Sequence, residues 1–159
     1  MQNQIKNRER VTKFAEVNTS EKEVNNMLDL VSHETDRLDS RFLESACGDG
    51  NFLIEILNRK LKILIKNFKK NQYEFERNSI LVIGSLYGID ILNDNITTAR
   101  ERIFDKFCKE YNGLFKKNCD PNLVNSINYI IKKNVVQGDA LTLKKVGLDE
   151  PIVFSQWSI

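Results

Sequence analysis

Two glycines at the boundary between a strand and a helix constrain this chain more than any other feature of its sequence. Gly48 and Gly50 follow a short, partly apolar segment, residues 41–46, and interrupt any regular element there. From Asn51 to Phe68 apolar residues recur at helical spacing, which predicts a long amphipathic helix. Residues 41–68 are therefore predicted to form a strand, a tight turn and a helix, the repeating unit of α/β folds.

Strand and helix signals alternate along the rest of the chain. Ser20 and Glu23 match a capping box, in which each side chain accepts a hydrogen bond from the other residue's backbone at a helix start. The expected strands are residues 41–46, 86–91, 134–137 and 152–154, and the expected helices are residues 20–31, 51–68, 96–111 and 123–131. This order implies βαβ units and a mostly parallel sheet flanked by helices, so the expected fold class is α/β.

Four segments carry weaker signals. Residues 69–78 are mostly polar and fit either a connection or the start of a helix, whereas the apolar residues 80–83 fit a buried strand or one helical turn equally well. Residues 112–122 contain a glycine and a proline and predict a loop. The basic side chains of residues 59–70 predict a solvated helix face, with contact to DNA phosphates or a partner as the alternative.

Length and charge exclude several classes of protein. The 159 residues are enough for one domain. Lys and Arg number 24 against 22 Asp and Glu, so the net charge of +2 gives no case for nucleic-acid binding from composition. The N-terminus lacks the apolar core of a signal peptide, and no apolar run approaches about 20 residues. We therefore expect a cytoplasmic protein with no membrane partner.

Cysteine and histidine usage argues against metal and nucleophilic chemistry. Cys47, Cys108 and Cys119 lie far apart and form no CxxC pair, so we expect neither a disulfide framework nor a zinc site. His33 is the only histidine, which excludes any site that needs two imidazoles, and we interpret it as a surface or capping residue. Cys47 is interpreted as a small buried residue rather than a nucleophile. No metal is expected.

Acidic residues follow three of the expected strands. Glu44, Asp90 and Asp139 stand where these strands end, and the carboxyl ends of parallel strands share one edge of a sheet. A negative crevice there suits a ligand with an adenosine, an ammonium and a sulfonium, and it suits a polyphosphate badly. A dinucleotide fingerprint is also absent, because Leu53 stands where its last glycine would be, and no GK[ST] follows the glycines.

Residues 44–53, Glu-Ser-Ala-Cys-Gly-Asp-Gly-Asn-Phe-Leu, carry a family resemblance. They resemble the cofactor-binding motif of adenine-specific DNA methyltransferases of restriction-modification systems, usually acid-Pro-Ala-Cys-Gly-Ser/Thr-Gly-x-Phe-Leu. Ser45 replaces the proline and Asp49 replaces the Ser or Thr. Three further segments resemble the family's motifs in the family's order. They are residues 14–19 (usually GEVFTP), residues 87–91 (the ribose motif) and residues 138–141 (the adenine motif).

The resemblance implies a Rossmann-like S-adenosylmethionine-dependent methyltransferase fold with an incomplete sheet. Residues 1–40 would be an N-terminal helical segment that contributes to the cofactor site. Residues 41–159 would be the cofactor-binding domain, truncated before the catalytic and target-recognition regions. The resemblance also implies contacts with S-adenosylmethionine. Thr19 would contact the methionine carboxylate, and Glu44, Ala46 and Gly48 would surround the methionine part, with Gly50 in the same turn. Asp90 would hold the ribose hydroxyls, Ile91 would pack against the adenine, and Asp139 with Ala140 would lie at the adenine amino group.

The family transfers a methyl group to a flipped adenine with a motif [N/D]PP[Y/F], and this chain contains no such motif. The residues after 154 are Ser155, Gln156 and Trp157, so the catalytic residues are unknown. The expected function is therefore the cofactor-binding part of a DNA N6-adenine methyltransferase, with DNA bound through missing regions or a second subunit. The alternatives are a non-catalytic scaffold module of a restriction complex and the cofactor half of an RNA or protein methyltransferase.

Each candidate residue also has a purely structural interpretation. Gly48 and Gly50 fit an ordinary strand-to-helix turn, and Asp90 fits a cap for the helix that begins near residue 93. Asp139 fits a turn, and Thr19 fits a contributor to the cap at Ser20. Trp157 fits an apolar gap or an interface better than a base-stacking position.

Overall fold

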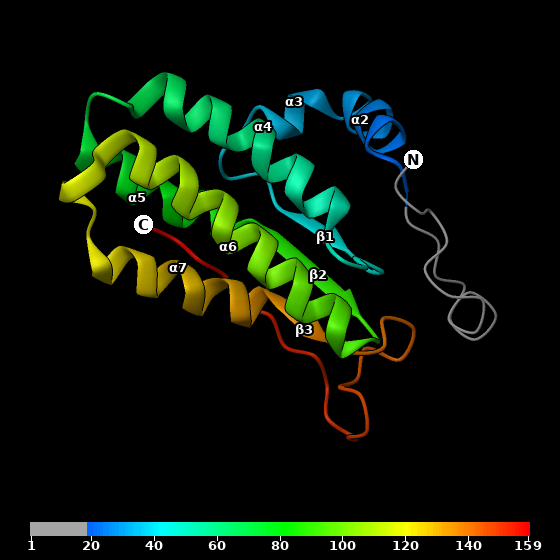
Figure 1. The fold of residues 1–159 in the computed structure, drawn as a ribbon. Coiled ribbons are helices and arrows are strands. Elements are labelled where there is room, and N and C mark those ends of the chain that lie inside the picture. Colours follow the sequence, from blue (N-terminus) through cyan, green and yellow to red (C-terminus); the bar gives the residue numbers. More distant parts are fainter. Residues whose placement is uncertain (1–18) are drawn as a thin grey trace.

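The computed structural model describes residues 19–159, which form six α-helices, one 3-10 helix and three strands (Figure 1). In chain order these are α2 (Glu21–Asp29), α3 (Ser32–Thr35), β1 (Phe42–Glu44), α4 (Asn51–Phe68), α5 (Gln72–Gly84), β2 (Leu86–Asp90), α6 (Asn93–Phe115), the 3-10 helix (Lys116–Asn118), α7 (Pro121–Asn134) and β3 (Val135–Gln137). None of these described helices is long and apolar enough to cross a membrane.

The three strands form one parallel sheet in the order β1-β2-β3. Phe42 of β1 lies opposite Leu86 of β2, and Gly88 of β2 lies opposite Val135 of β3. Two helices connect each pair of strands, α4 and α5 first and then α6 and α7. The predicted α/β class and the parallel arrangement of the first three strands are therefore confirmed.

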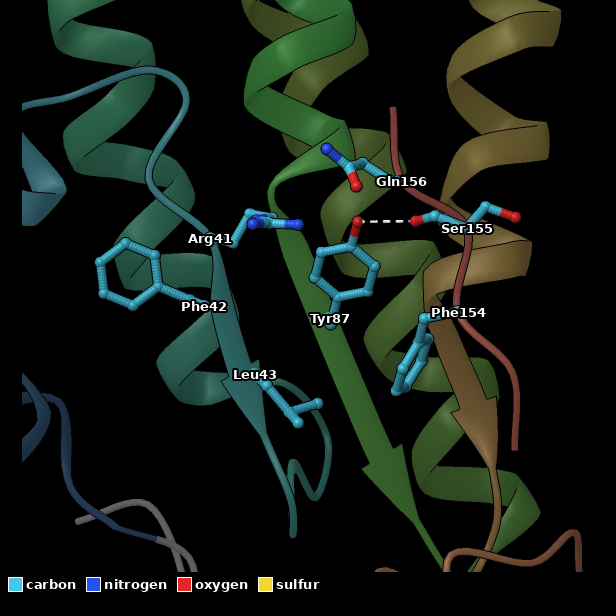
Figure 2. Close-up of a pocket in the computed structure, with 7 residues that line it drawn as sticks. All are labelled: Arg41, Phe42, Leu43, Tyr87, Phe154, Ser155 and Gln156. Carbon is cyan, nitrogen blue, oxygen red and sulfur yellow. Dashed lines mark hydrogen bonds between the residues drawn. The ribbon is translucent and has the colours of Figure 1, made fainter. Parts of the chain in front are cut away.

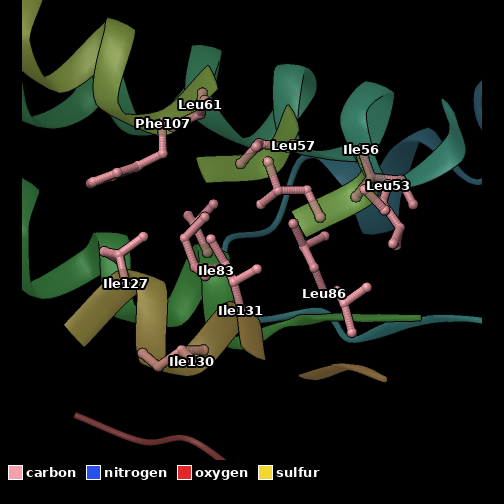
Figure 3. Packing of buried hydrophobic residues seen from close by; sticks show 14 of the residues in the cluster. Leu53, Ile56, Leu57, Leu61, Ile83, Leu86, Phe107, Ile127, Ile130 and Ile131 are labelled. Atoms are coloured by element: carbon pink, nitrogen blue, oxygen red, sulfur yellow. The ribbon is translucent and has the colours of Figure 1, made fainter. Parts of the chain in front are cut away.

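The apolar core lies between the helices and one face of the sheet, and Figure 3 shows part of it. Because residues three and four apart share a helix face, α4 and α6 each present a continuous apolar stripe to it. Fully buried members include Leu53, Leu57, Leu61, Leu64, Phe75, Ile83, Leu86, Ile96, Ile103, Phe107 and Ile127. These contacts confirm the periodicity from which the long helices were predicted.

The apolar segment 80–83 belongs to α5 rather than to a strand. This helix begins after Asn71, whose side chain accepts a hydrogen bond from the backbone of Glu74. The predicted loop at residues 112–122 is also mostly helical, because α6 continues to Phe115 and α7 starts at Pro121. Pro121 occupies the first helical position, where its missing N–H would have had no partner in the helix.

The predicted strand at residues 152–154 is wrong, since this segment is extended but pairs with none of the three strands. Two of its apolar side chains, Ile152 and Phe154, pack on residues of the sheet and its edge, whereas Val153 is exposed. Ile152 lies against Gly138, where an added Cβ would come within 2.4 Å of Ile152 Cδ1. The Phe154 ring packs edge-on against Tyr87, with 5.1 Å between ring centroids.

Trp157 fills an apolar gap, as the structural interpretation predicted. Its ring lies against Gly84, where an added Cβ would come within 2.8 Å of Trp157 Cβ. Its indole Nε1 donates to Asn134 Oδ1 at 2.8 Å, and its ring packs edge-on against Tyr129. These contacts hold the C-terminal segment against the ends of α5 and α7.

The basic face of α4 is only partly solvated. Lys62 and Lys66 are exposed, as predicted. Arg59 instead donates to Asp29 Oδ1 at 2.7 Å and to Asn25 Oδ1 at 2.9 Å, which holds α2 against α4. The sequence could not reveal this contact, because the residues involved are about 30 positions apart.

Lys60 is fully buried, contrary to the prediction of a solvated side chain. Its ammonium donates to Leu38 O at 3.1 Å, to Ser40 O at 2.5 Å and to Ser85 Oγ at 2.8 Å. These three bonds use all three ammonium protons, so Lys60 joins α4 to the segment that enters β1 and to the end of α5. Burial lowers the pKa of Lys60 from its ordinary value of 10.5 to about 8.

We expect Lys60→Met to lower the free energy of unfolding by about 3 kcal/mol at neutral pH, because two buried acceptors, Ser40 O and Ser85 Oγ, lose their donor. The pKa of Lys60 is lower in the folded than in the unfolded chain, so between about pH 8 and 10.5 the unfolded chain binds more protons. Over that range the wild type should gain stability relative to the variant, by at most about 1.4 kcal/mol per pH unit.

Urea unfolding of both proteins at several pH values measures this difference. The control is Lys62→Met, at an exposed position of the same helix, which should change stability by less than about 0.5 kcal/mol. Identical pH slopes for the wild type and Lys60→Met would contradict the prediction.

Candidate functional site

The turn between β1 and α4 is closed by backbone hydrogen bonds. Cys47 N donates to Ile89 O of β2, and Gly50 N donates to Cys47 O, both at 2.9 Å. Gly48 has a φ of +54° and Gly50 a φ of +93°, a left-handed region that strains any residue with a Cβ. The predicted strand, turn and helix are therefore present, and the turn lies at the carboxyl edge of the sheet.

The two glycines of this turn do different things. A Cβ on Gly50 would lie 3.1 Å from the Cβ of Ala99, so Gly50 allows α4 and α6 to pack closely. Among residues 19–159, no atom would lie within 4 Å of a Cβ on Gly48, so Gly48 borders open space in the described part of the chain. The contacts thus account for Gly50 by helix packing, and they leave Gly48 as the glycine whose backbone a ligand can approach.

The carboxylate of Asp90 connects the end of β2 to the glycine turn. Its Oδ2 accepts a hydrogen bond from Gly48 N at 2.9 Å, and its Oδ1 accepts from Leu92 N at 2.8 Å and from Asn95 Nδ2 at 3.3 Å. The bond to Leu92 orders the entry to α6, but it is not the helix cap that the structural interpretation predicted, because Leu92 is itself the N-cap residue and α6 has no side-chain cap hydrogen bond. Two carboxylate oxygens offer about four acceptor positions, so capacity remains for a further donor.

The end of β3 lies beside the end of β2. Gly138 N donates to Asp90 O at 2.9 Å, and Gln137 Nε2 donates to Ile91 O at 3.0 Å. Ile91 is 40% exposed, so part of its side chain is available for contact. The residues that resemble the ribose and adenine motifs are therefore neighbours at the edge that also holds the glycine turn.

Asp139 and Ala140 follow β3 and are half-buried. Asp139 Oδ1 accepts from Leu141 N at 2.8 Å, which is the local turn that the structural interpretation predicted. Asp139 N donates to Lys144 O at 2.9 Å, which anchors the base of the loop that precedes the C-terminal segment. Asp139 thus has a structural role whether or not it also contacts a ligand.

The pKa shifts of Glu44 and Cys47 indicate the electrostatic environment at this edge of the sheet. Glu44 is half-buried, and this burial raises the pKa of its carboxyl group, while a bond of 3.4 Å from the exposed Ala46 N works against the rise. Burial, and then the charges of Asp90 and Glu44, raise the pKa of Cys47 to about 12. The thiol is therefore protonated at neutral pH, and the interpretation of Cys47 as a small buried residue is confirmed.

Thr19 lies next to the start of α4. Its carbonyl oxygen accepts from Asn51 Nδ2 at 3.4 Å, so the chain before α2 passes close to the glycine turn. The cap of α2 itself is the predicted capping box of Ser20 and Glu23. The rest of the segment that resembles the upstream motif, residues 14–18, lies outside the described residues.

Arg102 and Gly88 were not singled out from the sequence, yet both shape the turn. Arg102 Nη1 donates to Asp49 O at 2.7 Å and to Asn51 Oδ1 at 2.9 Å, and it forms an ion pair of 3.3 Å with Asp49. A Cβ on Gly88 would lie 2.9 Å from Leu53 Cδ1. Helical spacing is the sequence signal that could have indicated a role for Arg102, because Arg102 stands three residues after an apolar position of α6 and so lies on the same side of the helix.

Neither a metal cluster nor a known relative identifies the site. Among residues 19–159, no three His, Cys, Asp or Glu side chains gather closely enough to hold a metal ion. Comparisons of the chain with protein-family models, with curated proteins and with solved structures find no match. The site must therefore be interpreted from its own geometry.

We expect Gly50→Ala to destabilise the fold more than Gly48→Ala. Both changes place a Cβ on a left-handed residue, at a cost of about 1–2 kcal/mol, but only Gly50→Ala also pushes a methyl group against Ala99. Thermal or urea unfolding of the two variants measures the difference. Equal destabilisation, or a larger loss for Gly48→Ala, would contradict the assignment of Gly50 to helix packing.

Proposed function

We propose that this chain is the S-adenosylmethionine-binding part of a DNA N6-adenine methyltransferase of a restriction-modification system. The observation that carries the proposal is the hydrogen bond from Gly48 N to Asp90, which joins two segments that resemble that family's motifs. The parallel order β1-β2-β3, with the turn after each strand at one edge, is compatible with a Rossmann-like sheet. Ligands of such sheets bind at the carboxyl ends of the strands.

The residues at this edge fit the parts of the cofactor. Gly48 borders open space and lets the methionine part approach, while Glu44 and Ala46 stand next to it in the chain. Asp90 accepts from a ribose hydroxyl at the one acceptor position that its three hydrogen bonds leave open. The other proposed contacts are Ile91 and Ala140 against the adenine, Asp139 at the adenine amino group, Thr19 near the methionine carboxylate, and Gly50 as support of the turn. When bound, S-adenosylmethionine supplies an electrophilic methyl group on a sulfonium.

Charge supports a cationic ligand rather than a polyphosphate. The carboxylates of Asp90 and Glu44 raise the pKa of Cys47, so the potential beside the turn is negative. Asp49 has its own counter-ion in Arg102, which leaves this pair of carboxylates facing the proposed site. A positive sulfonium gains from such a potential, whereas the triphosphate of ATP is repelled.

Calorimetric titration of the folded chain with S-adenosylmethionine and with its demethylated product tests the proposal. We expect both to bind, ATP to bind at least tenfold more weakly, and Asp90→Ala to weaken cofactor binding at least tenfold through loss of a charge-assisted acceptor. Gly48→Ala should also weaken binding, because its methyl group occupies the open space beside the turn.

Asp105→Asn is the matched control, because it removes an exposed carboxylate from α6 and should leave the binding constant unchanged. Circular dichroism and unfolding curves establish that each variant is folded. If the folded wild type produces no binding heat with either compound, the proposal is wrong. The scaffold alternative is then favoured, since the hydrogen bonds of Asp90 and Asp139 to local backbone groups also suit a purely structural site.

Methyl transfer requires residues that this chain does not contain. We propose that another segment or subunit supplies the polar residue and the aromatic ring of the [N/D]PP[Y/F] motif, together with DNA recognition. We therefore expect no methylated adenine when the chain alone is incubated with duplex DNA and isotopically labelled S-adenosylmethionine. Incorporation of label into N6-methyladenine would contradict this part of the proposal.

A further inference from the structure

A cleft of about 340 Å³ lies on the face of the sheet opposite the apolar core (Figure 2). It is lined by residues 41–43, by Tyr87 of β2 and by residues 154–156. Successive side chains of a strand point to opposite faces, so Tyr87 faces the cleft while Gly88 faces α4. The volume falls within the range of small-ligand sites, about 300–1,000 Å³. No residue of the proposed cofactor site lines it.

The floor of the cleft is aromatic and apolar. Tyr87 and Phe154 pack edge to face with 5.1 Å between centroids, and Leu43 stands beside them with 57% of its surface exposed. Parallel sheets are usually covered on both faces, yet within the described residues an extended segment is what covers this one. Tyr87 is itself only 7% exposed, so an apolar ring entering the cleft would bury mainly the surface of Leu43 and Phe154 that now contacts water.

The rim of the cleft carries one charged side chain. Arg41 is exposed and enters no ion pair or hydrogen bond within residues 19–159, and Figure 2 shows it beside the hydroxyl end of Tyr87. Tyr87 donates its hydroxyl proton to Ser155 O at 2.8 Å, so the hydroxyl oxygen retains its acceptor positions. Burial raises the pKa of Tyr87, and the charge of Arg41 works against that rise.

We propose that this cleft binds a small aromatic anion. The ring of the ligand lies on Tyr87, Phe154 and Leu43, and its acidic group pairs with the guanidinium of Arg41. Within the described residues the guanidinium of Arg41 has no carboxylate partner and lies next to an aromatic floor, which favours this class over neutral or cationic ligands. The inference does not depend on the proposed cofactor site, which lies at the carboxyl edge of the sheet.

Two fluorescent probes that differ in one group test the proposal. 1-Anilinonaphthalene-8-sulfonate carries a sulfonate on its ring system, and N-phenyl-1-naphthylamine has the same rings without it. We expect the sulfonate to bind the wild type at one site, Arg41→Gln to weaken it about tenfold and Arg41→Lys to weaken it less. The neutral probe should bind the wild type more weakly than the sulfonate does, and Arg41→Gln should leave its binding constant unchanged.

Two other variants distinguish binding in the cleft from non-specific binding of the probe to exposed apolar side chains. Leu43→Glu changes an exposed position of the edge strand and should abolish sulfonate binding by repulsion, while Arg37→Gln removes a charge elsewhere and should have no effect. Equal sulfonate binding by the wild type, Arg41→Gln and Leu43→Glu would overturn the proposal, as would no binding at all. A dimer in sedimentation experiments that excludes the probe would also overturn it, because a second copy would then occupy the cleft.

Discussion

The hydrogen bond from Gly48 N to Asp90 is the contact on which the candidate site depends. It joins residues 42 positions apart in the sequence and fixes the turn after β1 against the end of β2. The left-handed backbone that presents this N–H is accessible at low cost because Gly48 has no Cβ. Without this contact, the glycine turn and the acidic strand ends would not share one edge with a defined geometry.

The short strand β1 is held at both ends rather than by its own length. With only three residues, β1 makes few ladder bonds, so its position depends on its neighbours. Lys60 binds the carbonyl groups of Leu38 and Ser40 before the strand, and the Gly48 contact fixes the chain after it. A buried charge that uses all its protons is costly to desolvate but holds its acceptors in one arrangement. The edge that carries the proposed cofactor site thus depends on a lysine at the opposite end of β1.

Helix periodicity and glycine chemistry made much of the fold predictable. The helices Asn51–Phe68 and Glu21–Asp29 follow local rules, an apolar stripe in the first and a capping box in the second. The structure of segments 80–83 and 152–154 could not be predicted from such local rules, because a short apolar run is equally suited to a helix, a strand or a sheet-covering segment. The helical character of residues 112–122 was missed because Tyr111 and Asp120 stabilise this region through contacts across the helix pair.

The sequence alone determined that the chain alternates strands with amphipathic helices, that a glycine turn follows the first strand, and that acids end the strands. These features depend on local backbone preferences and on residue spacing, both of which can be read along one chain. The tertiary structure decided that Gly50 serves packing and Gly48 borders open space, that Arg102 neutralises Asp49, and that Lys60 is buried. These four features depend on contacts between side chains that are about 20 to 50 positions apart in the sequence. Neither composition nor residue spacing shows which of such distant residues come into contact.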